Sequence, residues 1–86
     1  MPTAKILIFT TPFCGYCAAA KLLLKKKGVV YEEIDISSDT LLREKMIEVA
    51  GRTSVPQIFI DDEHIGGFDD IATLDSAGDL DARLGL

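Results

Sequence analysis

The segment from Lys5 to Phe9 limits the fold of this chain more than any other. Its last four residues are apolar without interruption and include β-branched and aromatic side chains. A strand that does not alternate between apolar and polar residues is buried on both faces. We therefore predict a buried central strand here. A chain of 86 residues is long enough for one domain, which we expect to span residues 1–86.

The segments after this strand are predicted from apolar periodicity, and glycines mark the ends of the helices. The expected elements are a helix from Cys14 to Lys27, a strand from Val30 to Ile36, a helix capped by Ser38 or Asp39 and ended by Gly51, a strand from Gln57 to Ile60, a short strand at His64–Ile65, a helix capped by Asp69 or Asp70 and ended near Gly78, and a terminal turn of helix carrying Leu80 and Leu84. The residues assigned to the buried face of the second helix are Leu42, Met46, Val49 and Ala50.

The order of these elements, β-α-β-α-β-β-α, determines the fold class. A strand–helix–strand start requires a right-handed crossover and gives a parallel pair of strands. The short turn between the third and fourth strands gives an antiparallel hairpin. We therefore predict an α/β protein with a four-stranded mixed sheet and helices on both faces of the sheet.

The charges are distributed unevenly along the chain. Residues 1–30 contain five lysines and no acidic residue, whereas residues 31–86 contain four basic and fourteen acidic residues, which gives the net charge of −5. Nucleic-acid binding needs a broad basic face, so the acidic balance argues against it. The basic segment contains both cysteines. It is either an ordinary solvated helix face or a source of positive potential that favours a thiolate and attracts anionic substrates.

The apolar segments are all short. None approaches the roughly 20 residues that cross a bilayer, and the stretch of about five near the start of the chain is too short for the core of a signal peptide. We therefore expect a cytoplasmic protein that does not enter a membrane. In a reducing cytoplasm, paired cysteines are more often redox-active or metal-binding than permanently bonded.

Cys14 and Cys17 lie where the first strand is expected to lead into the first helix. Residues three apart on a helix share one face at about 5–6 Å, a separation that a disulfide tolerates. At the helix start, free backbone N–H groups and the positive end of the helix dipole stabilise a thiolate. The loop exposes Cys14, while Cys17 lies one turn further in. We predict that Cys14 is the nucleophile and that Cys17 resolves, forming a redox disulfide with it.

Two other roles for the cysteines are less favoured. A structural zinc site needs four ligands, and the one further cysteine or histidine in the chain is His64, on a predicted strand end. We expect no metal site, and we expect His64 to be a surface residue. Inert buried cysteines are the remaining alternative, but their position between a strand and a helix favours redox chemistry.

Three motifs follow one another along the chain: Cys14–Cys17 with the sequence Cys-Gly-Tyr-Cys, the segment Arg52–Ile60, and the segment Gly66–Asp70. Together they resemble the glutaredoxin family over nearly the full length. The resemblance implies a thioredoxin-like fold, a cis peptide bond before Pro56, and a monomer that uses glutathione. It also implies a glutathione-binding set made of Thr11, Tyr16, Ser54, Val55, Pro56, Gly67, Phe68, Asp69 and Asp70.

The chain departs from the usual pattern of this family at two positions. Gly15 stands where proline is commonest, and glycine is less preorganised than proline at a helix start. Thr11 stands where many members carry a lysine that contacts a carboxylate of glutathione. Arg43 and Arg52 are the candidates to replace that lysine.

The resemblance implies an enzyme that reduces protein disulfides and glutathione mixed disulfides, with glutathione as reductant and no tightly bound cofactor. One alternative is a dimer that holds a [2Fe–2S] cluster through Cys14 of each subunit and two glutathiones, which the small Gly15 keeps open. Another is an electron donor reduced by a flavin reductase. Thioredoxins, which are reduced in that way, typically carry a tryptophan beside the active-site cysteine, and this chain has none.

Overall fold

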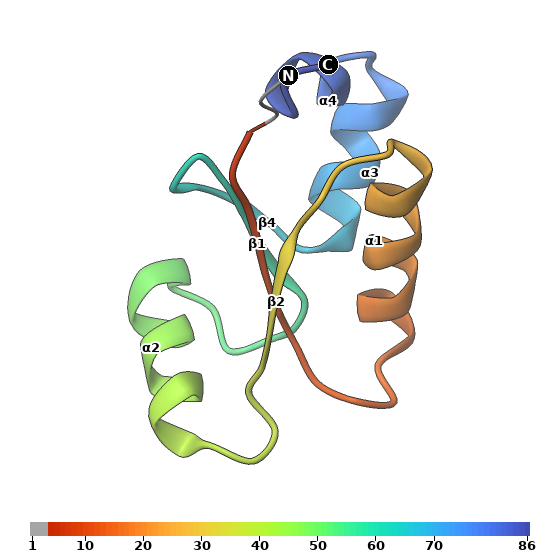
Figure 1. Ribbon diagram of the computed structural model, residues 1–86. Helices are drawn as coiled ribbons and strands as arrows, with labels where there is room; N and C mark the ends of the chain where they lie inside the picture. Colours follow the sequence, from red (N-terminus) through yellow and green to blue (C-terminus); the bar gives the residue numbers. More distant parts are fainter. Residues whose placement is uncertain (1–3) are drawn as a thin grey trace.

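The computed structural model describes residues 4–86, which form one sheet with helices on both sides (Figure 1). The sheet has four strands in the order β2-β1-β3-β4. β1 pairs in parallel with β2, whereas β3 is antiparallel to both β1 and β4. The predicted mixed sheet is therefore confirmed. The strands are β1 at Ile6–Thr10, β2 at Glu32–Asp35, β3 at Gln57–Ile60 and β4 at Glu63–Gly66.

The helices form two layers on opposite sides of this sheet (Figure 1). α1 and α3 lie together on one side, and α2 covers the other. The helices are α1 at Gly15–Lys26, α2 at Thr40–Ala50, α3 at Phe68–Ser76 and the short α4 at Leu80–Arg83. Within residues 4–86, no helix has both the length and the apolar character of a membrane span.

The side chains of β1 divide between two hydrophobic cores, which confirms that the strand is buried on both faces. Ile6 and Ile8 pack into the core beneath α1 and α3. Phe9 packs into a smaller core beneath α2, where it meets Phe59 edge to face with ring centroids 6.0 Å apart. Burial of a side chain of this size contributes about 1.5–3 kcal/mol. The two cores therefore fix both helix layers to one central strand.

The predicted helix starts are partly confirmed. Asp39 caps α2, and its Oδ1 accepts a hydrogen bond of 2.9 Å from the Leu41 N–H. Neither Asp69 nor Asp70 caps α3, because the N-cap is Gly67 and both aspartates lie in the first turn. Asp70 reaches back from the third helical position to the N–H of Gly67, so a carboxylate satisfies the helix start without occupying the cap.

Three smaller predictions were wrong. β2 is shorter than Val30–Ile36 and includes neither end of that range. β4 begins at Glu63, one residue before the predicted start. Val49 is 42% exposed, because the buried stripe of α2 is centred between Met46 and Ala50, and Val49 lies at its edge.

Candidate functional site

Cys14 forms the N-cap of α1, at the predicted helix start. Its Sγ accepts a hydrogen bond of 3.2 Å from the backbone N–H of Cys17. The first turn of α1 contains no acidic residue, so no carboxylate competes for the helix's free N–H groups. The Cys14 thiol also lies 3.9 Å from the carbonyl oxygen of Val55. The half-buried sulfur is thus located between a helix start and the loop that precedes Pro56.

Cys17 has a different environment, although it lies only one helical turn further along. Its side chain is 1% exposed. Burial, together with the side-chain hydrogen bond of the Cys17 thiol to Cys14, raises the pKa of Cys17 to about 11. Cys17 therefore stays a protonated thiol at neutral pH. Both cysteines are free thiols in the structure.

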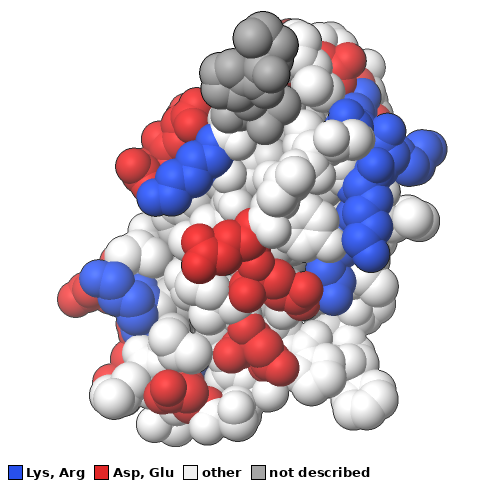
Figure 2. Space-filling view, in the orientation of Figure 1, with Lys and Arg blue, Asp and Glu red and all other residues white. Residues whose placement is uncertain are grey.

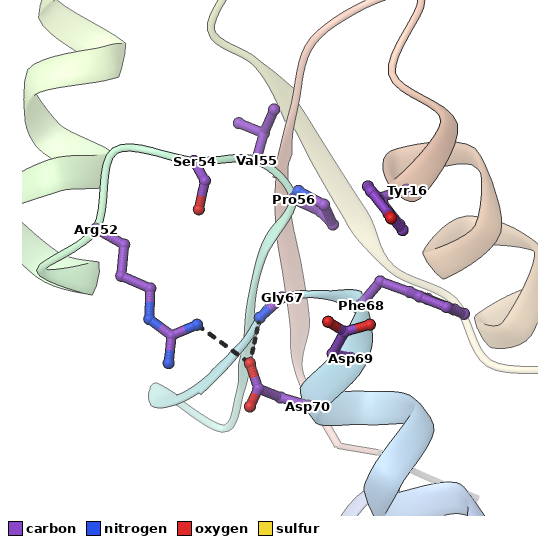
Figure 3. Close-up of a pocket in the computed structure, with 9 residues that line it drawn as sticks. All are labelled: Tyr16, Arg52, Ser54, Val55, Pro56, Gly67, Phe68, Asp69 and Asp70. Carbon is purple, nitrogen blue, oxygen red and sulfur yellow. Dashed lines mark hydrogen bonds and ion pairs between the residues drawn. The ribbon is translucent and has the colours of Figure 1, made fainter.

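A cleft of about 260 Å³ opens beside this helix start (Figure 3). It brings together residues from α1, from the loop before β3 and from the start of α3, which are distant in the sequence. The lining residues are Tyr16, Arg52, Ser54, Val55, Pro56, Gly67, Phe68, Asp69 and Asp70. Eight of these nine belong to the glutathione-binding set predicted from the sequence. The peptide bond between Val55 and Pro56 is cis, as the resemblance implied.

Thr11 is the one member of the predicted set that does not line this cleft. It lies in a second depression, on the other side of the α1 start, which is also lined by Cys14 and Cys17. Phe13 is fully exposed there, and its backbone φ of 61° lies in the left-handed region. The structure therefore places Thr11 outside the cleft that gathers the other eight residues.

One wall of the cleft is aromatic. The rings of Tyr16 and Phe68 stack with their centroids 6.3 Å apart and an interplanar angle of 29°. This contact joins the first turn of α1 to the first turn of α3. Tyr16 remains 65% exposed, so a bound molecule can cover its ring without displacing another part of the chain.

The opposite wall is polar and is organised by Asp70 (Figure 3). Its Oδ2 accepts hydrogen bonds from the Gly67 N–H at 2.8 Å and from Arg52 Nη1 at 3.1 Å. The Gly67 N–H and then the Arg52 guanidinium lower the pKa of Asp70 below its usual range, against the opposing effect of burial. Gly66 has a φ of +125°, and a Cβ there would collide with the Asp70 carboxylate. The glycine pair therefore lets the chain pass close to this carboxylate.

The two arginines proposed as lysine replacements have different positions. Arg52 lines the cleft and forms the ion pair with Asp70. Arg43 instead donates from Nη2 to the carbonyl oxygen of Thr53 at 3.3 Å. The structure thus leaves Arg52 as the cation that faces the cleft, while Arg43 supports the loop from outside.

The basic segment around the cysteines is partly neutralised by ion pairs. Basic side chains gather over α1, and acidic side chains cover β2 next to it (Figure 2). Lys21 pairs with Glu33 at 3.0 Å, and Lys27 pairs with Asp75 and Asp81. Since the lysine nearest to Cys17 along the helix is already paired, the solvated and ion-paired helix face accounts for much of this basic run.

The sequence analysis did not predict the contact between two polar residues of the β3–β4 hairpin, Gln57 and His64. His64, predicted to lie on the surface, is only partly exposed, and its ring packs 5.1 Å from that of Phe59. Its Nε2 lies 2.7 Å from Oε1 of Gln57, which is completely buried. The available signal was Gln57 itself, because a polar residue at the start of a fully buried strand needs a partner.

In the part of the chain that the structure describes, residues 4–86, no three side chains of His, Cys, Asp or Glu gather in a metal-binding arrangement. What the site does contain is a half-buried sulfur at a helix start, a second sulfur buried behind it, and a neighbouring cleft that contains backbone donors and a cation. This arrangement suits thiol–disulfide exchange with a small charged thiol compound.

Comparison with known proteins gives the same result in sequence and in structure. The family described as glutaredoxin matches residues 6–65. The chain is 51% identical over 81 residues to glutaredoxin 3 of Escherichia coli, which covers 94% of this chain and 98% of that relative. It is 53% identical over 83 residues to a probable glutaredoxin of Synechocystis, covering 95% and 94% of the two chains.

Among solved structures, a buckwheat glutaredoxin–glutathione complex resembles this chain with a TM-score of 0.88 and 27% sequence identity. The match covers 95% of this chain and 77% of that chain. These similarities confirm both the resemblance drawn from the three sequence motifs and the thioredoxin-like fold.

Proposed function

Since the chain belongs to the glutaredoxin family of redox proteins, we propose that it reduces protein disulfides and glutathione mixed disulfides with electrons from glutathione. The observation that carries this proposal is the Cys14 sulfur, which caps α1 beside the cleft and accepts the Cys17 N–H. Backbone donors at a helix start stabilise the anionic form of the sulfur, which is the form that attacks.

The reaction on a glutathionylated protein begins at Cys14. Its thiolate attacks the glutathione sulfur, a Cys14–glutathione disulfide forms, and the protein thiolate leaves and takes up a proton. The thiolate of a second glutathione then attacks the glutathione sulfur held on Cys14. Glutathione disulfide leaves, and the Cys14 thiolate is regenerated.

The reaction on a protein disulfide requires Cys17. Cys14 attacks one sulfur of the substrate and forms a mixed disulfide with it, releasing the other sulfur as a thiolate. Cys17 then loses its proton and attacks Cys14, so the second substrate sulfur leaves and a Cys14–Cys17 disulfide forms. Two molecules of glutathione reduce that disulfide in two exchange steps. Burial of Cys17 supports this division of roles, because it keeps the second thiol out of the first encounter.

The lining of the cleft supports glutathione as the electron donor. The Val55 backbone can pair with the extended tripeptide as a short added strand. The Phe68 backbone and the Asp69 carboxylate can meet the carboxylate and the ammonium group of the γ-glutamyl end. The Gly67 N–H itself is taken by Asp70. Arg52 can hold the glycyl carboxylate in place of the lysine that Thr11 replaces. Glutathione is named in the description of the buckwheat structure.

The proposal is tested by following NADPH consumption in an assay coupled to glutathione reductase. We expect Cys14→Ser to reduce turnover to the uncatalysed rate on every substrate. Cys17→Ser is expected to keep activity on a glutathionylated peptide and to lose activity on a peptide with an internal disulfide. Normal turnover by Cys14→Ser would refute the mechanism. Reduction of the oxidised protein by a flavin reductase, but not by glutathione, would reassign the electron donor.

A second candidate function rests on Gly15. A side chain at this position would meet no other part of the molecule outside its own helix turn, so the space beside Gly15 is open. Each subunit of a dimer would supply Cys14 as one ligand of a [2Fe–2S] cluster, and two glutathiones would supply the remaining thiolates. Visible absorption after anaerobic reconstitution with iron, sulfide and glutathione tests this function, and a colourless monomer would exclude it.

A further inference from the structure

Gln57 is a polar side chain at the beginning of a strand whose four residues are all buried. It is itself 0% exposed. Its Nε2 donates to the carbonyl oxygen of Ser54 at 3.0 Å and to the Ser54 Oγ at 3.3 Å. Its Oε1 accepts from His64 Nε2 at 2.7 Å. Both the NH₂ group and the oxygen of the Gln57 amide therefore have hydrogen-bond partners, which a buried amide needs to avoid a cost in stability.

The direction of these bonds follows from the acceptor at one end. A carbonyl oxygen cannot donate, so the Gln57 amide group that faces Ser54 must be the NH₂ group. The oxygen of Gln57 then faces His64, and His64 must carry a hydrogen on Nε2. Burial and the nearby Arg52 lower the pKa of His64, with Asp70 opposing them, so the imidazole donates in its neutral form.

This chain of hydrogen bonds ends at the cleft. Ser54 and Val55 both line it, and the carbonyl oxygen of Val55 is the group 3.9 Å from the Cys14 sulfur. On the preceding residue, Arg43 Nη2 holds the Thr53 carbonyl oxygen. Two consecutive peptide carbonyls of the loop, those of Thr53 and Ser54, are therefore fixed by side chains from other elements. The peptide group of Val55 follows directly, so its orientation depends on both anchors.

We propose that His64 and Gln57 are positioning residues, which hold the Ser54–Val55 backbone in the orientation that binds the glutathione part of the substrate. This inference rests on the proposed function. His64 acts through Gln57 and touches neither the cleft nor the cysteines. The hydrogen bonds from Ser54 to Gln57 and from Gln57 to His64 thus connect the cleft to β3 and then to β4.

The proposal predicts that glutathione binding changes while the reactivity of Cys14 does not. A general loss of structure would change both together. Without the His64 donor, the Gln57 oxygen is buried and unpaired, and the amide can leave Ser54 to find another partner. The loop then samples orientations in which Val55 cannot pair with glutathione. The closer contact of the Cys14 sulfur, with the Cys17 N–H of α1 at 3.2 Å, stays unchanged, and only the longer 3.9 Å contact with the Val55 carbonyl oxygen is affected.

Two substitutions each remove one hydrogen bond of this network. His64→Leu removes the donor to Gln57. Gln57→Glu keeps an acceptor for His64 but removes the donor to Ser54. The matched control is Glu63→Gln, on the same strand β4, which breaks the exposed ion pair with Arg83. A rise in KM of about five- to tenfold, equivalent to roughly 1 kcal/mol, is expected for a glutathionylated peptide with the first two variants. The control is expected to match the wild type.

Three measurements decide the outcome. The rate of Cys14 alkylation by iodoacetamide should be the same in all folded variants, and kcat should stay within about twofold. Titration of glutathione into the Cys14→Ser background, followed by NMR, should show the same loss of affinity when His64→Leu is added. An unchanged KM and affinity in a folded His64→Leu protein would overturn the proposal, as would a parallel fall in kcat and alkylation rate.

The same experiment distinguishes failure of the proposed function. If the wild type shows no glutathione-dependent turnover but His64→Leu still weakens glutathione binding, the positioning role stands and the catalytic function falls. If glutathione binds to neither protein, both are wrong. An imidazole Nε2–H signal in NMR spectra of the wild type, shifted in Gln57→Leu, is the expected signature of the hydrogen bond; its absence would contradict the proposed network.

Discussion

The starts of α1 and α3 face the same cleft and are built in opposite ways. In α1 the N-cap is Cys14 and the third helical residue is Cys17, whose N–H donates to the cap sulfur. In α3 the N-cap is Gly67 and the third helical residue is Asp70, whose carboxylate accepts from the cap N–H. One helix start is closed by a carboxylate of its own, and the other is left with a sulfur as its only side-chain acceptor.

This difference supports the division of roles in the proposed function, in which the α1 side reacts and the α3 side binds. A helix start carries roughly half a positive elementary charge. In α3, Asp69 and Asp70 lie in the first turn and offset it, and the ion pair with Arg52 fixes that wall. In α1 no acidic residue lies in the first turn. The uncompensated field there is available to a thiolate at Cys14.

The largest expected effect is on the pH dependence of the unfolding free energy. Cys17 and Asp70, the third residues of α1 and α3, have pKa values shifted in opposite directions. Cys17 ionises near 9.0 in the unfolded chain and near about 11 in the folded protein. Its contribution to stability is therefore complete below pH 9 and is lost as the pH rises toward 11, because the unfolded state releases the proton first. We expect the reduced protein to lose about 2 kcal/mol over this range.

Urea unfolding under reducing conditions between pH 7 and pH 11 measures this loss. Cys17→Ala lacks the buried thiol and serves as the control, since all other titrating groups are shared. Parallel pH profiles for the two proteins would contradict the assigned shift of the Cys17 pKa.

The next effect comes from making α1 resemble α3. Gly15→Asp places a carboxylate in the first turn of α1, where the structure has open space. The carboxylate competes for the helix field and repels a thiolate at Cys14, so we expect alkylation of Cys14 by iodoacetamide to slow about tenfold. Gly15→Asn has nearly the same shape without the charge and should react at close to the wild-type rate. Equal rates for the two variants would show that the helix start does not govern the reactivity of Cys14.

A smaller effect is expected when the closure of α3 is removed. Asp70→Asn should cost about 1 kcal/mol of unfolding free energy at pH 7, because the charged acceptor of the Gly67 N–H is lost. The pKa of Asp70 is lowered in the folded protein, so this contribution is present above about pH 3.8 and disappears as the pH falls through the folded value. Asp69→Asn, one residue earlier, is the control. A difference between Asp70→Asn and the wild type that persists undiminished at pH 2 would be inconsistent with a charged cap.

The smallest effect concerns the freedom of the α1 start. Gly15 has an open Cβ position and no positive φ, so Gly15→Ala should fit without strain. We expect it to raise the unfolding free energy by about 0.5 kcal/mol, because alanine restricts the unfolded chain. Thermal unfolding measures this change, and a destabilised variant would indicate that the first turn of α1 is not held as the structure shows.

The fold was predictable from the sequence to the level of strand and helix order. The uninterrupted apolar run before Thr10 and the glycines after each helix act locally, so a single sequence contains their signal. The start of α3 was less predictable. An aspartate stabilises a helix start from the N-cap or from the third position, and the sequence Gly67-Phe68-Asp69-Asp70 does not distinguish the two.

The residues of the candidate site that belong to sequence motifs were predictable. The side-chain contacts between residues distant in the sequence were not. Eight of the nine predicted glutathione residues line one cleft, because the motifs lie at the ends of elements that the sheet brings together. The pairs Arg52–Asp70 and Gln57–His64 were not predicted. Arg52–Asp70 joins the loop before β3 to α3, and Gln57–His64 joins the two strands of the β3–β4 hairpin, so each pair depends on side-chain orientations between separate elements.

The position of both sulfurs on α1 has a consequence for recognition of the protein by its partners. A bond between Cys14 and Cys17 spans a single turn of one helix, so it joins no separate elements and requires no movement of the sheet or of α2. The outline of the molecule should therefore be nearly the same before and after it delivers two electrons. A partner that distinguishes the reduced dithiol protein from its disulfide form therefore has to recognise the few atoms around the Cys14 sulfur, because the overall shape of the molecule is the same in both forms.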